Sequence, residues 1–175
     1  MVKRNNDPGR RGLPVLLSAL LMCSPLALAA TADVSVEGAV VTPTCAVSGP
    51  ASHSLGNMTP GTKQQKSPYT LQVTCQTDRA YLLYGEALSV ASQGQDSVGM
   101  KVDGQVPAIA QQTTLKLLSN GTAIRLDGTG STDDGATFCM GTTAQSCTLV
   151  PEVDVPAGAL KGSVSATLRF SLRHP

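Results

Sequence analysis

The sequence predicts an all-β sandwich, and three observations support this fold class. Gly, Thr, Ser and Val abound while strong helix formers are sparse, and Trp is absent from the 175 residues. Short runs of alternating apolar and polar residues recur between turn residues, which is typical of a sandwich or a barrel. The mature chain shows no long helical periodicity and no convincing internal repeat.

Residues 1–29 are expected to be a secretory signal peptide. Four basic residues within 3–11 precede an apolar run at 13–30 that ends in small residues. Prolines and serines interrupt the run, so a membrane-spanning helix, which needs about 20 apolar residues, is the weaker alternative. Ala27 and Ala29 fit cleavage before Ala30, and the neighbouring alanines would serve almost as well. The mature chain is therefore expected to begin within a few residues of Ala30.

The mature chain has the size of one domain and a nearly balanced charge. Removing residues 1–29 leaves 146 residues, with nine Lys plus Arg against eleven Asp plus Glu, a net charge of −2. This length suffices for one domain with a real core. No basic patch remains that would indicate a nucleic-acid partner.

Four cysteines remain after Cys23 leaves with the signal peptide, and an even number in an exported chain indicates disulfides. Four cysteines allow three pairings. We favour Cys45 with Cys75 and Cys139 with Cys147, because each pair closes a modest loop between strand-like segments. Zinc binding is the rival interpretation, but neither C-x2-C nor H-x3-H spacing occurs.

Four segments carry the strand pattern. Residues 69–75 alternate, and residues 113–128 contain Asn120-Gly121, the favoured type I′ hairpin turn. Residues 147–155 and 162–172 supply two more, and the last is the strongest of all. The residues expected on one face of that last strand are Val164, Ala166, Leu168, Phe170 and Leu172. Loops are expected at 48–68, 89–99 and 127–137.

An N-terminal arm at residues 30–44 precedes the first cysteine of the mature chain. Its alternation puts Val34, Val36, Gly38 and Val40 on one side. An ordinary first strand, half buried in its own sheet, is one interpretation. Gly38 argues against it, because glycine inside a strand costs stability unless another backbone or a bulky side chain must approach closely there.

The arm, the cysteine pair and the C-terminus together resemble a fimbrial subunit of chaperone–usher pili, most closely the type 1 pilus group. The pattern V-x-V-x-G-x-V-V runs into T-P-T-C at Cys45, and Cys75 follows an alternating strand. The segment S-L-G-N-M-T-P-G at 54–61 resembles the L-G-x segment that such subunits carry between their two cysteines. The middle of the chain, from about Tyr81 to Val155, matches only in general β character.

The resemblance implies an incomplete immunoglobulin-like β-sandwich of six strands at 45–175, whose last strand is supplied by a partner. It makes the arm a donor strand, in which Val34, Val36 and Val40 fill the groove of a neighbouring subunit and Gly38 is the small residue beside a constriction. The residues it places at the groove and against a chaperone are Leu168, Phe170 and Leu172. The partners it implies are other pilin subunits, a periplasmic chaperone and an outer-membrane usher, and the destination is a cell-surface fimbrium that supports adhesion.

Two features depart from the family pattern. Such subunits commonly end with a tyrosine at the next-to-last position, where this chain has His174 followed by Pro175. The pair Cys139 and Cys147 lies outside the common pattern and is interpreted as a disulfide that constrains a loop.

Other function classes find little support in the residues, so the chain is expected to be no enzyme and to bind no cofactor or metal. A hydrolase would have only the scattered His53, Ser54 and Asp78, with no G-x-S-x-G elbow. The carboxylates at 127–135 fit neither the EF-hand nor the nonapeptide calcium spacing, so a solvated loop is favoured. A monomeric, secreted carbohydrate-binding sandwich is the main alternative, although such sites usually use exposed aromatic rings and this chain has few.

Overall fold

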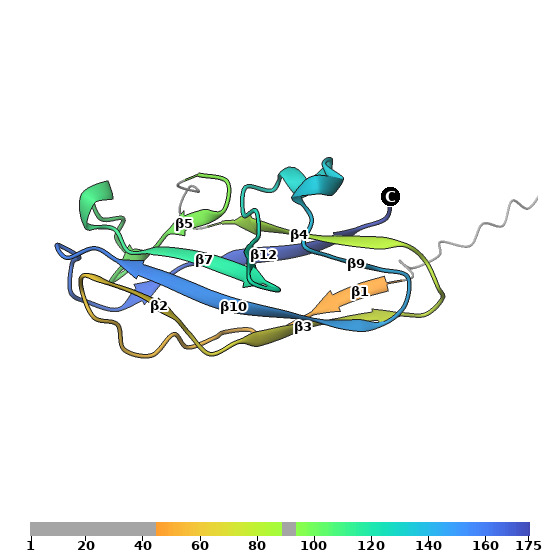
Figure 1. Cartoon of the computed structure of the whole chain (residues 1–175), viewed down its shortest axis with the longest axis horizontal. Helices are drawn as coiled ribbons and strands as arrows, with labels where there is room; N and C mark the ends of the chain where they lie inside the picture. Colours follow the sequence, from red (N-terminus) through yellow and green to blue (C-terminus); the bar gives the residue numbers. More distant parts are fainter. Residues whose placement is uncertain (1–44, 89–93) are drawn as a thin grey trace, which may run out of the picture. The chain divides into compact units, whose positions relative to one another are not determined.

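The computed structural model describes residues 45–88 and 94–175, which form twelve strand segments in two layers (Figure 1). This confirms the all-β sandwich. The resemblance implied six strands, and the larger number arises because several segments are only two or three residues long. The signal peptide at 1–29 and the arm at 30–44, with Val34, Val36, Gly38 and Val40, lie outside the described residues.

The larger sheet contains seven strands. They are β1 (Cys45–Ser48), β2 (Thr62–Gln65), β3 (Tyr69–Cys75), β5 (Ser97–Gly99), β7 (Thr114–Ser119), β8 (Thr122–Ala123) and β10 (Gln145–Val155). Their order is β1-β3-β10-β7-β5, with β2 added beside β10 and β8 beside β7. All the pairs are antiparallel, as short connections in an all-β domain favour.

The second layer is a three-stranded sheet in the order β12-β4-β9, made of β4 (Tyr81–Ala87), β9 (Cys139–Gly141) and β12 (Leu168–Arg173). A further pair, β6 (Lys101–Val102) with β11 (Val164–Ser165), continues along the chain segment that leads into β12. Three single 3₁₀ turns complete the elements: η1 (Ile109–Gln111), η2 (Thr129–Ser131) and η3 (Asp134–Ala136). Among the described residues, no helix has the length and apolar character needed to cross a membrane.

The longest strand, β10, changes partners along its length. Its first half pairs with β3 as far as Leu149, and its second half pairs with β7 and β2. Pro151 lies where β3 ends and β2 begins on one side of the strand, and its carbonyl accepts a bond from the Lys66 amide at 2.8 Å. A proline inside a long strand is tolerated at such an interruption because no ladder bond from its nitrogen is needed there.

The structure confirms two of the predicted strand signals closely. Residues 69–75 form β3 with the predicted bounds, and Leu71 and Val73 on the predicted inner face are buried. Asn120 and Gly121 link β7 to β8 with φ of 51° and 80°. Two positive φ values in a two-residue connection define the type I′ turn that this pair of residues favours.

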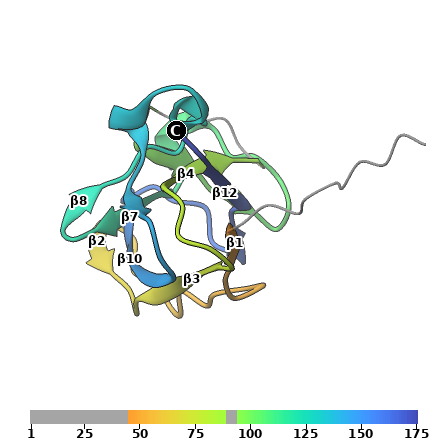
Figure 2. The same cartoon turned by 90° about the vertical axis from the view of Figure 1, so that its right-hand side faces the viewer.

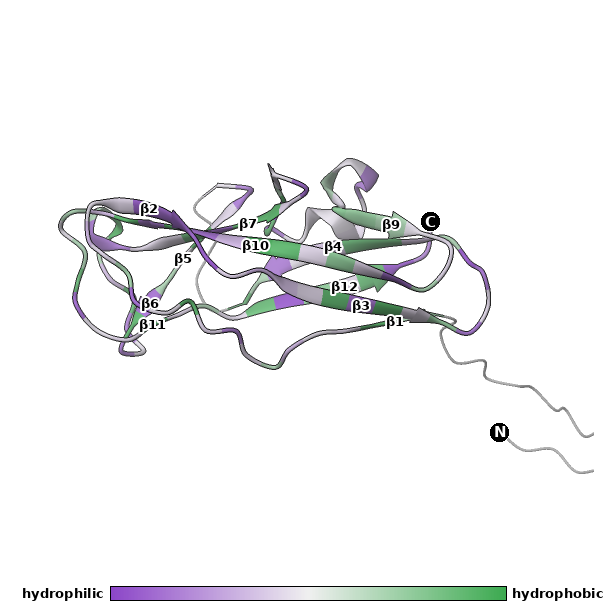
Figure 3. Cartoon of the chain, turned by 60° about the horizontal axis from the view of Figure 1, so that its bottom comes forward, coloured by the Kyte–Doolittle hydropathy of each residue, from purple (hydrophilic) through white to green (hydrophobic). Residues whose placement is uncertain are grey.

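Other signals were missed or divided. The strand expected at 162–172 is interrupted between β11 and β12, because Val164 pairs with β6 whereas Leu168 begins the ladder with β4. Strand β2 lies inside an expected loop, because its sequence is polar throughout (Figure 3). Strand β5 lies inside another, and β4 was missed because its first three residues are all buried and do not alternate.

Apolar side chains from both sheets fill the space between the layers. Side chains with at most 1% of their surface exposed come from both layers, and they are Tyr81, Leu83, Val98, Met100, Leu117, Leu126, Leu149 and Val153. Two disulfides flank this core. Cys45–Cys75 joins β1 to β3 within the larger sheet, and Cys139–Cys147 joins β9 of the smaller sheet to β10 of the larger. These are the two pairs that loop length favoured.

Candidate binding groove between two edge strands

Two unpaired strand edges lie on the same side of the sandwich. Within residues 45–88 and 94–175, β1 pairs only with β3, and β12 pairs only with β4. Figure 2 shows β1 and β12 on one side of the molecule, each at the margin of its sheet. Both edges therefore present backbone N–H and C=O groups that no described strand satisfies.

A groove of about 1150 Å³ begins at the end of β1, where Val47 and Ser48 line it, and continues beside the chain from β11 to Phe170 of β12. Its floor is apolar, because Leu71, Leu115 and Leu117 of the larger sheet line it. One wall begins with Val47 of β1 and continues through the segment that follows this strand. The other wall is the chain from β11 into β12.

The second wall carries the alternating residues that the sequence singled out. Along 163–170, exposed and half-buried residues alternate strictly, and the half-buried ones are Val164, Ala166, Leu168 and Phe170. All four line the groove and pack against the core. Leu172 is also half-buried against the core but is not part of the groove lining. The side chains are thus covered on the core side and uncovered on the groove side.

Aromatic rings form a row beneath this wall. The ring of Phe170 lies 6.4 Å from that of Tyr69 on β3 and 5.9 Å, edge to face, from that of Phe138. The imidazole of His53 lies 4.9 Å from the Tyr69 ring. Burial raises the pKa of the Tyr69 hydroxyl well above its usual range, so the phenol stays neutral. The row fixes Phe170 at the boundary between core and groove.

The segment after β1 supplies groove residues that sequence reasoning missed. Residues 49–61 were expected to form a loop and do so, but Leu55 and Met58 are half-buried and line the groove. Gly49 allows the chain to pass close to the floor, since a Cβ atom there would lie 2.6 Å from Leu71 Cδ2. The available signal was the presence of two large apolar residues in an otherwise polar segment.

Polar contacts on the other face of the smaller sheet hold the C-terminal end of β12. Arg173 Nε donates to the Gly130 carbonyl at 2.8 Å, and its guanidinium also binds the Asp134 carboxylate. His174 Nδ1 lies 2.7 Å from the Ala80 carbonyl. The last residue of β12 and the residue after it are therefore anchored on the same domain, and His174 stands where the family pattern has a tyrosine.

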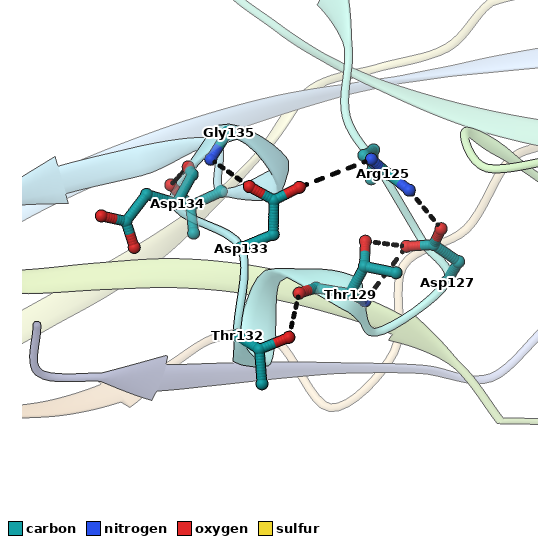
Figure 4. Close-up of polar contacts among 8 residues, drawn as sticks. Arg125, Asp127, Thr129, Thr132, Asp133, Asp134 and Gly135 are labelled. Atoms are coloured by element: carbon teal, nitrogen blue, oxygen red, sulfur yellow. Dashed lines mark hydrogen bonds and ion pairs between the residues drawn. The ribbon is translucent and has the colours of Figure 1, made fainter.

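The segment at 127–135 is a hydrogen-bonded cluster (Figure 4). Asp127 accepts bonds from Arg125 at 2.9 Å and from the hydroxyl of Thr129 at 2.6 Å. Burial pulls the pKa of Asp127 upward, but the bonds from Arg125 and Thr129 outweigh it and lower that pKa to about 2. Asp133 caps the Gly135 amide at 2.9 Å. In the part of the chain that the structure describes, no group of three or more His, Cys, Asp or Glu side chains is arranged to hold a metal ion.

The residues considered for hydrolysis do not come together. His53 Nε2 lies 2.8 Å from the Ser67 carbonyl, close to the first residue of β3. Asp78 is exposed three residues beyond the other end of that strand. Because seven extended residues span about 20 Å, Asp78 lies far from His53 and Ser54.

No protein-family model matches the chain, and no curated protein matches it. Solved structures do share its fold. A structure of a chaperone–usher pilus that addresses rod uncoiling aligns with a TM-score of 0.54 and 14% identity, over 87% of this chain and 100% of that chain. The P pilus rod subunit PapA aligns with a TM-score of 0.52 and 15% identity, over 82% and 100%. The fold is that of chaperone–usher pilus subunits.

Proposed function

We propose that the chain is a structural subunit of a surface pilus that polymerises by donor-strand exchange. The observation that carries the proposal is the groove of about 1150 Å³ beside the unpaired edges of β1 and β12. In this proposal the occupant of the groove is the arm of a neighbouring copy, residues 30–44. The fold shared with a pilus rod subunit supports the same role. The proposal gives the chain no catalytic role.

The arm and the groove agree in length and in chemistry. Residues 32–40 would span about 30 Å as a strand, and residues 160–170, whose side lines the groove, would span at most about 36 Å. Val34, Val36 and Val40 fall on one side of the arm, where each would contribute roughly 1.5 kcal/mol on burial. With a row of ladder bonds at about 1 kcal/mol each, the gross gain is on the order of 10 kcal/mol before ordering costs.

The direction of the strands favours an arm from another copy. The start of β1 and the end of β12 lie at the same end of the sandwich, because Cys45 pairs with Cys75 and His174 contacts Ala80. A chain's own arm would have to reverse within residues 41–44 and would then run parallel to β12. An arm from a neighbour can enter antiparallel to β12, which is the more stable pairing. Repeated head-to-tail contacts of this kind give an open filament.

A subunit with an open groove needs a temporary occupant before assembly. Two unpaired edges beside half-buried apolar side chains are a strong aggregation hazard. We therefore assign this task to a periplasmic chaperone, with an outer-membrane usher as the exit to the cell surface, where the fibre would support adhesion. The chaperone–usher pilus among the solved structures of the same fold supports this route.

The monomeric carbohydrate-binding alternative gains no support from the aromatic residues. Sugar sites usually offer exposed rings as stacking platforms. All five Tyr and Phe residues of the chain are described, and each is buried or half-buried, namely Tyr69, Tyr81, Tyr84, Phe138 and Phe170.

Two charge substitutions on opposite sides of the arm test the proposal. Val36→Asp would place a carboxylate in the apolar groove and should abolish fibres, because an unpaired charge buried there is not compensated. Ser35→Asp adds the same charge on the side that faces away from the groove and should leave fibres intact. Electron microscopy and denaturing gels of surface extracts give the readout. Abundant fibres from Val36→Asp would overturn the proposal.

A further inference from the structure

The sandwich has two distinct ends, which are visible in Figure 3 as the end bearing β6 and β11 and the end bearing β1 and the C-terminus. The end at which β1 begins, where the arm joins the domain, is called the arm-root end: Cys45 is bonded there to Cys75, and His174 contacts Ala80, five residues after Cys75. At the opposite end, which we call the far end, the Asp103 amide donates to the Ser163 carbonyl at 2.8 Å, beside β11. The groove runs between the two ends.

Exposed apolar side chains lie at the far end. Within the described residues, the large hydrophobic side chains with the highest exposure there are Ile109 at 78%, Val106 at 59% and Leu160 at 46%. Leu160 also lines the groove, so we call only Val106 and Ile109 the far-end patch. The segment 104–112 that carries both residues contains no charged residue. We interpret this uncharged loop, with two large apolar side chains in water, as an interaction surface.

Hydrogen bonds fix the loop that presents the patch. Val102 and Gln105 exchange backbone bonds of 2.8 and 2.9 Å, and the Gln111 amide donates to the Ala108 carbonyl at 2.8 Å. Asp103 Oδ1 accepts from the Ser163 amide at 2.9 Å, which ties the loop to the segment that carries Leu160. The apolar side chains are thus held outward by an ordered backbone, so little ordering cost remains for a partner that covers them.

The proposed function brings a specific partner to this end. A neighbour's arm that runs antiparallel to β12 has its last groove residue, Val40, at the far end. Only residues 41–44 then separate that position from the neighbour's Cys45, a span of at most about 18 Å. The arm-root end of the neighbour must therefore lie beside the far end of the acceptor. Met140, which is 63% exposed on β9, lies close to that arm-root end because it pairs with Leu82.

We propose that the far-end patch is a second contact between consecutive copies of this chain, which docks on the arm-root end of the copy whose arm fills the groove. The inference rests on the proposed function, because the inserted arm is what brings the second copy into reach. The contact buries apolar surface that the arm itself leaves exposed. It makes the joint between whole subunits longer-lived than the same groove filled by an isolated arm.

The test compares two rates on the same variants of the mature chain. One is the rate at which a fluorescent peptide of residues 32–44 leaves the groove, and the other is the rate at which assembled fibres lose subunits to excess unlabelled peptide. The variant is Val106→Ser with Ile109→Ser. Leu88→Ser is the matched control, because Leu88 is 44% exposed but does not belong to the patch or the groove lining.

The double variant should release the peptide at the parent rate and lose fibre subunits at least about tenfold faster. Failure to form fibres with normal peptide binding would support the inference as well. Fibre loss at the parent rate, or a matching acceleration of peptide release, would overturn it. A parent chain that binds no peptide would instead refute the proposed function. A photo-crosslinking residue at position 109 adds a second readout, with crosslinks expected to residues 76–80 or 140–144 of another copy and none within the chain.

Discussion

The two flanks of the sandwich are built differently. On the flank of β9 and β10, Cys139–Cys147 joins the two sheets covalently. The hydroxyl of Tyr81 donates to the Thr143 carbonyl at 3.0 Å and seals the same side. On the flank of β1 and β12, no described strand connects the sheets, and a groove of about 1150 Å³ opens beside the two edges.

The side chains on the two flanks also differ in how deeply they are buried. Leu149 and Cys147 on β10 are 0% and 5% exposed, whereas Phe170 and Leu168 on β12 are only half-buried. The core is therefore complete on the closed flank and lacks one layer of partners on the open flank. A strand supplied from outside would make the two flanks equivalent, and this comparison yields predictions that differ between them.

The largest expected effect is at the centre of the smaller sheet, on β4. Leu83→Ala removes a fully buried side chain and should cost about 2 to 5 kcal/mol in the free energy of unfolding. Because Leu83 already has all its partners, the cost should be the same with and without a peptide of residues 32–44. Urea denaturation of both forms measures it, and a cost that doubles on peptide addition would contradict the comparison.

Removal of each disulfide in turn should affect stability and peptide binding in the groove differently. Replacing Cys45 and Cys75 by serine should cost about 3 to 4 kcal/mol and also weaken peptide binding, because β1 is a wall of the groove. Replacing Cys139 and Cys147 should cost about 2 to 3 kcal/mol and leave peptide affinity unchanged. Calorimetric titration with the peptide distinguishes the two variants. Equal losses of affinity would show that the flanks are not independent.

A smaller effect is expected on the open flank. Phe170→Ala should cost about 1 to 2 kcal/mol in the free chain, because the ring is only half-buried. The cost should rise once the peptide covers the ring. Denaturation of parent and variant, each with and without peptide, gives the four values needed, and a cost that does not depend on the peptide would count against a role in the groove.

The smallest effect concerns the hydrogen-bonded cluster at 127–135, which also contains Gly130 and Asp134, the two partners of Arg173. The lowered pKa of Asp127 means that its charged form stabilises the fold above about pH 4, and this contribution is lost as the pH falls towards 2. Asp127→Asn should therefore cost about 1 kcal/mol at pH 7, since solvent screens the pair with Arg125. The difference from the parent should vanish near pH 2. A difference that is constant from pH 7 to 2 would contradict this origin.

Local sequence patterns predicted the secondary structure of segments whose conformation depends on their own residues. The alternation at 69–75 and the Asn120-Gly121 turn rest on nearest-neighbour physics, and both appear as predicted. Strand β2 has no such pattern, because its residues are polar throughout. It forms by pairing with its neighbour β10 and not through the preference of its own residues. Strand β4 was missed for the opposite reason, since its start is buried on both faces.

The candidate groove was only half predictable. Leu168 and Phe170 follow from alternation, and the structure places both in the lining. The other wall, with Leu55 and Met58, depends on where a loop crosses the floor, which no local period encodes. The contact of His174 with Ala80 is also long-range, and no local sequence pattern predicts it. The role of the arm stays a prediction.

Backbone hydrogen exchange of residues 45–175, measured with and without a peptide of residues 32–44, tests the central claim most directly. We expect the amides of β1 and β12 to gain strong protection on peptide addition, while those of β9 and β10 in the closed flank change little. A soluble, cooperatively folded monomer whose β1 and β12 amides are already protected, and do not respond to the peptide, would contradict the claim that the sandwich awaits a strand from another copy.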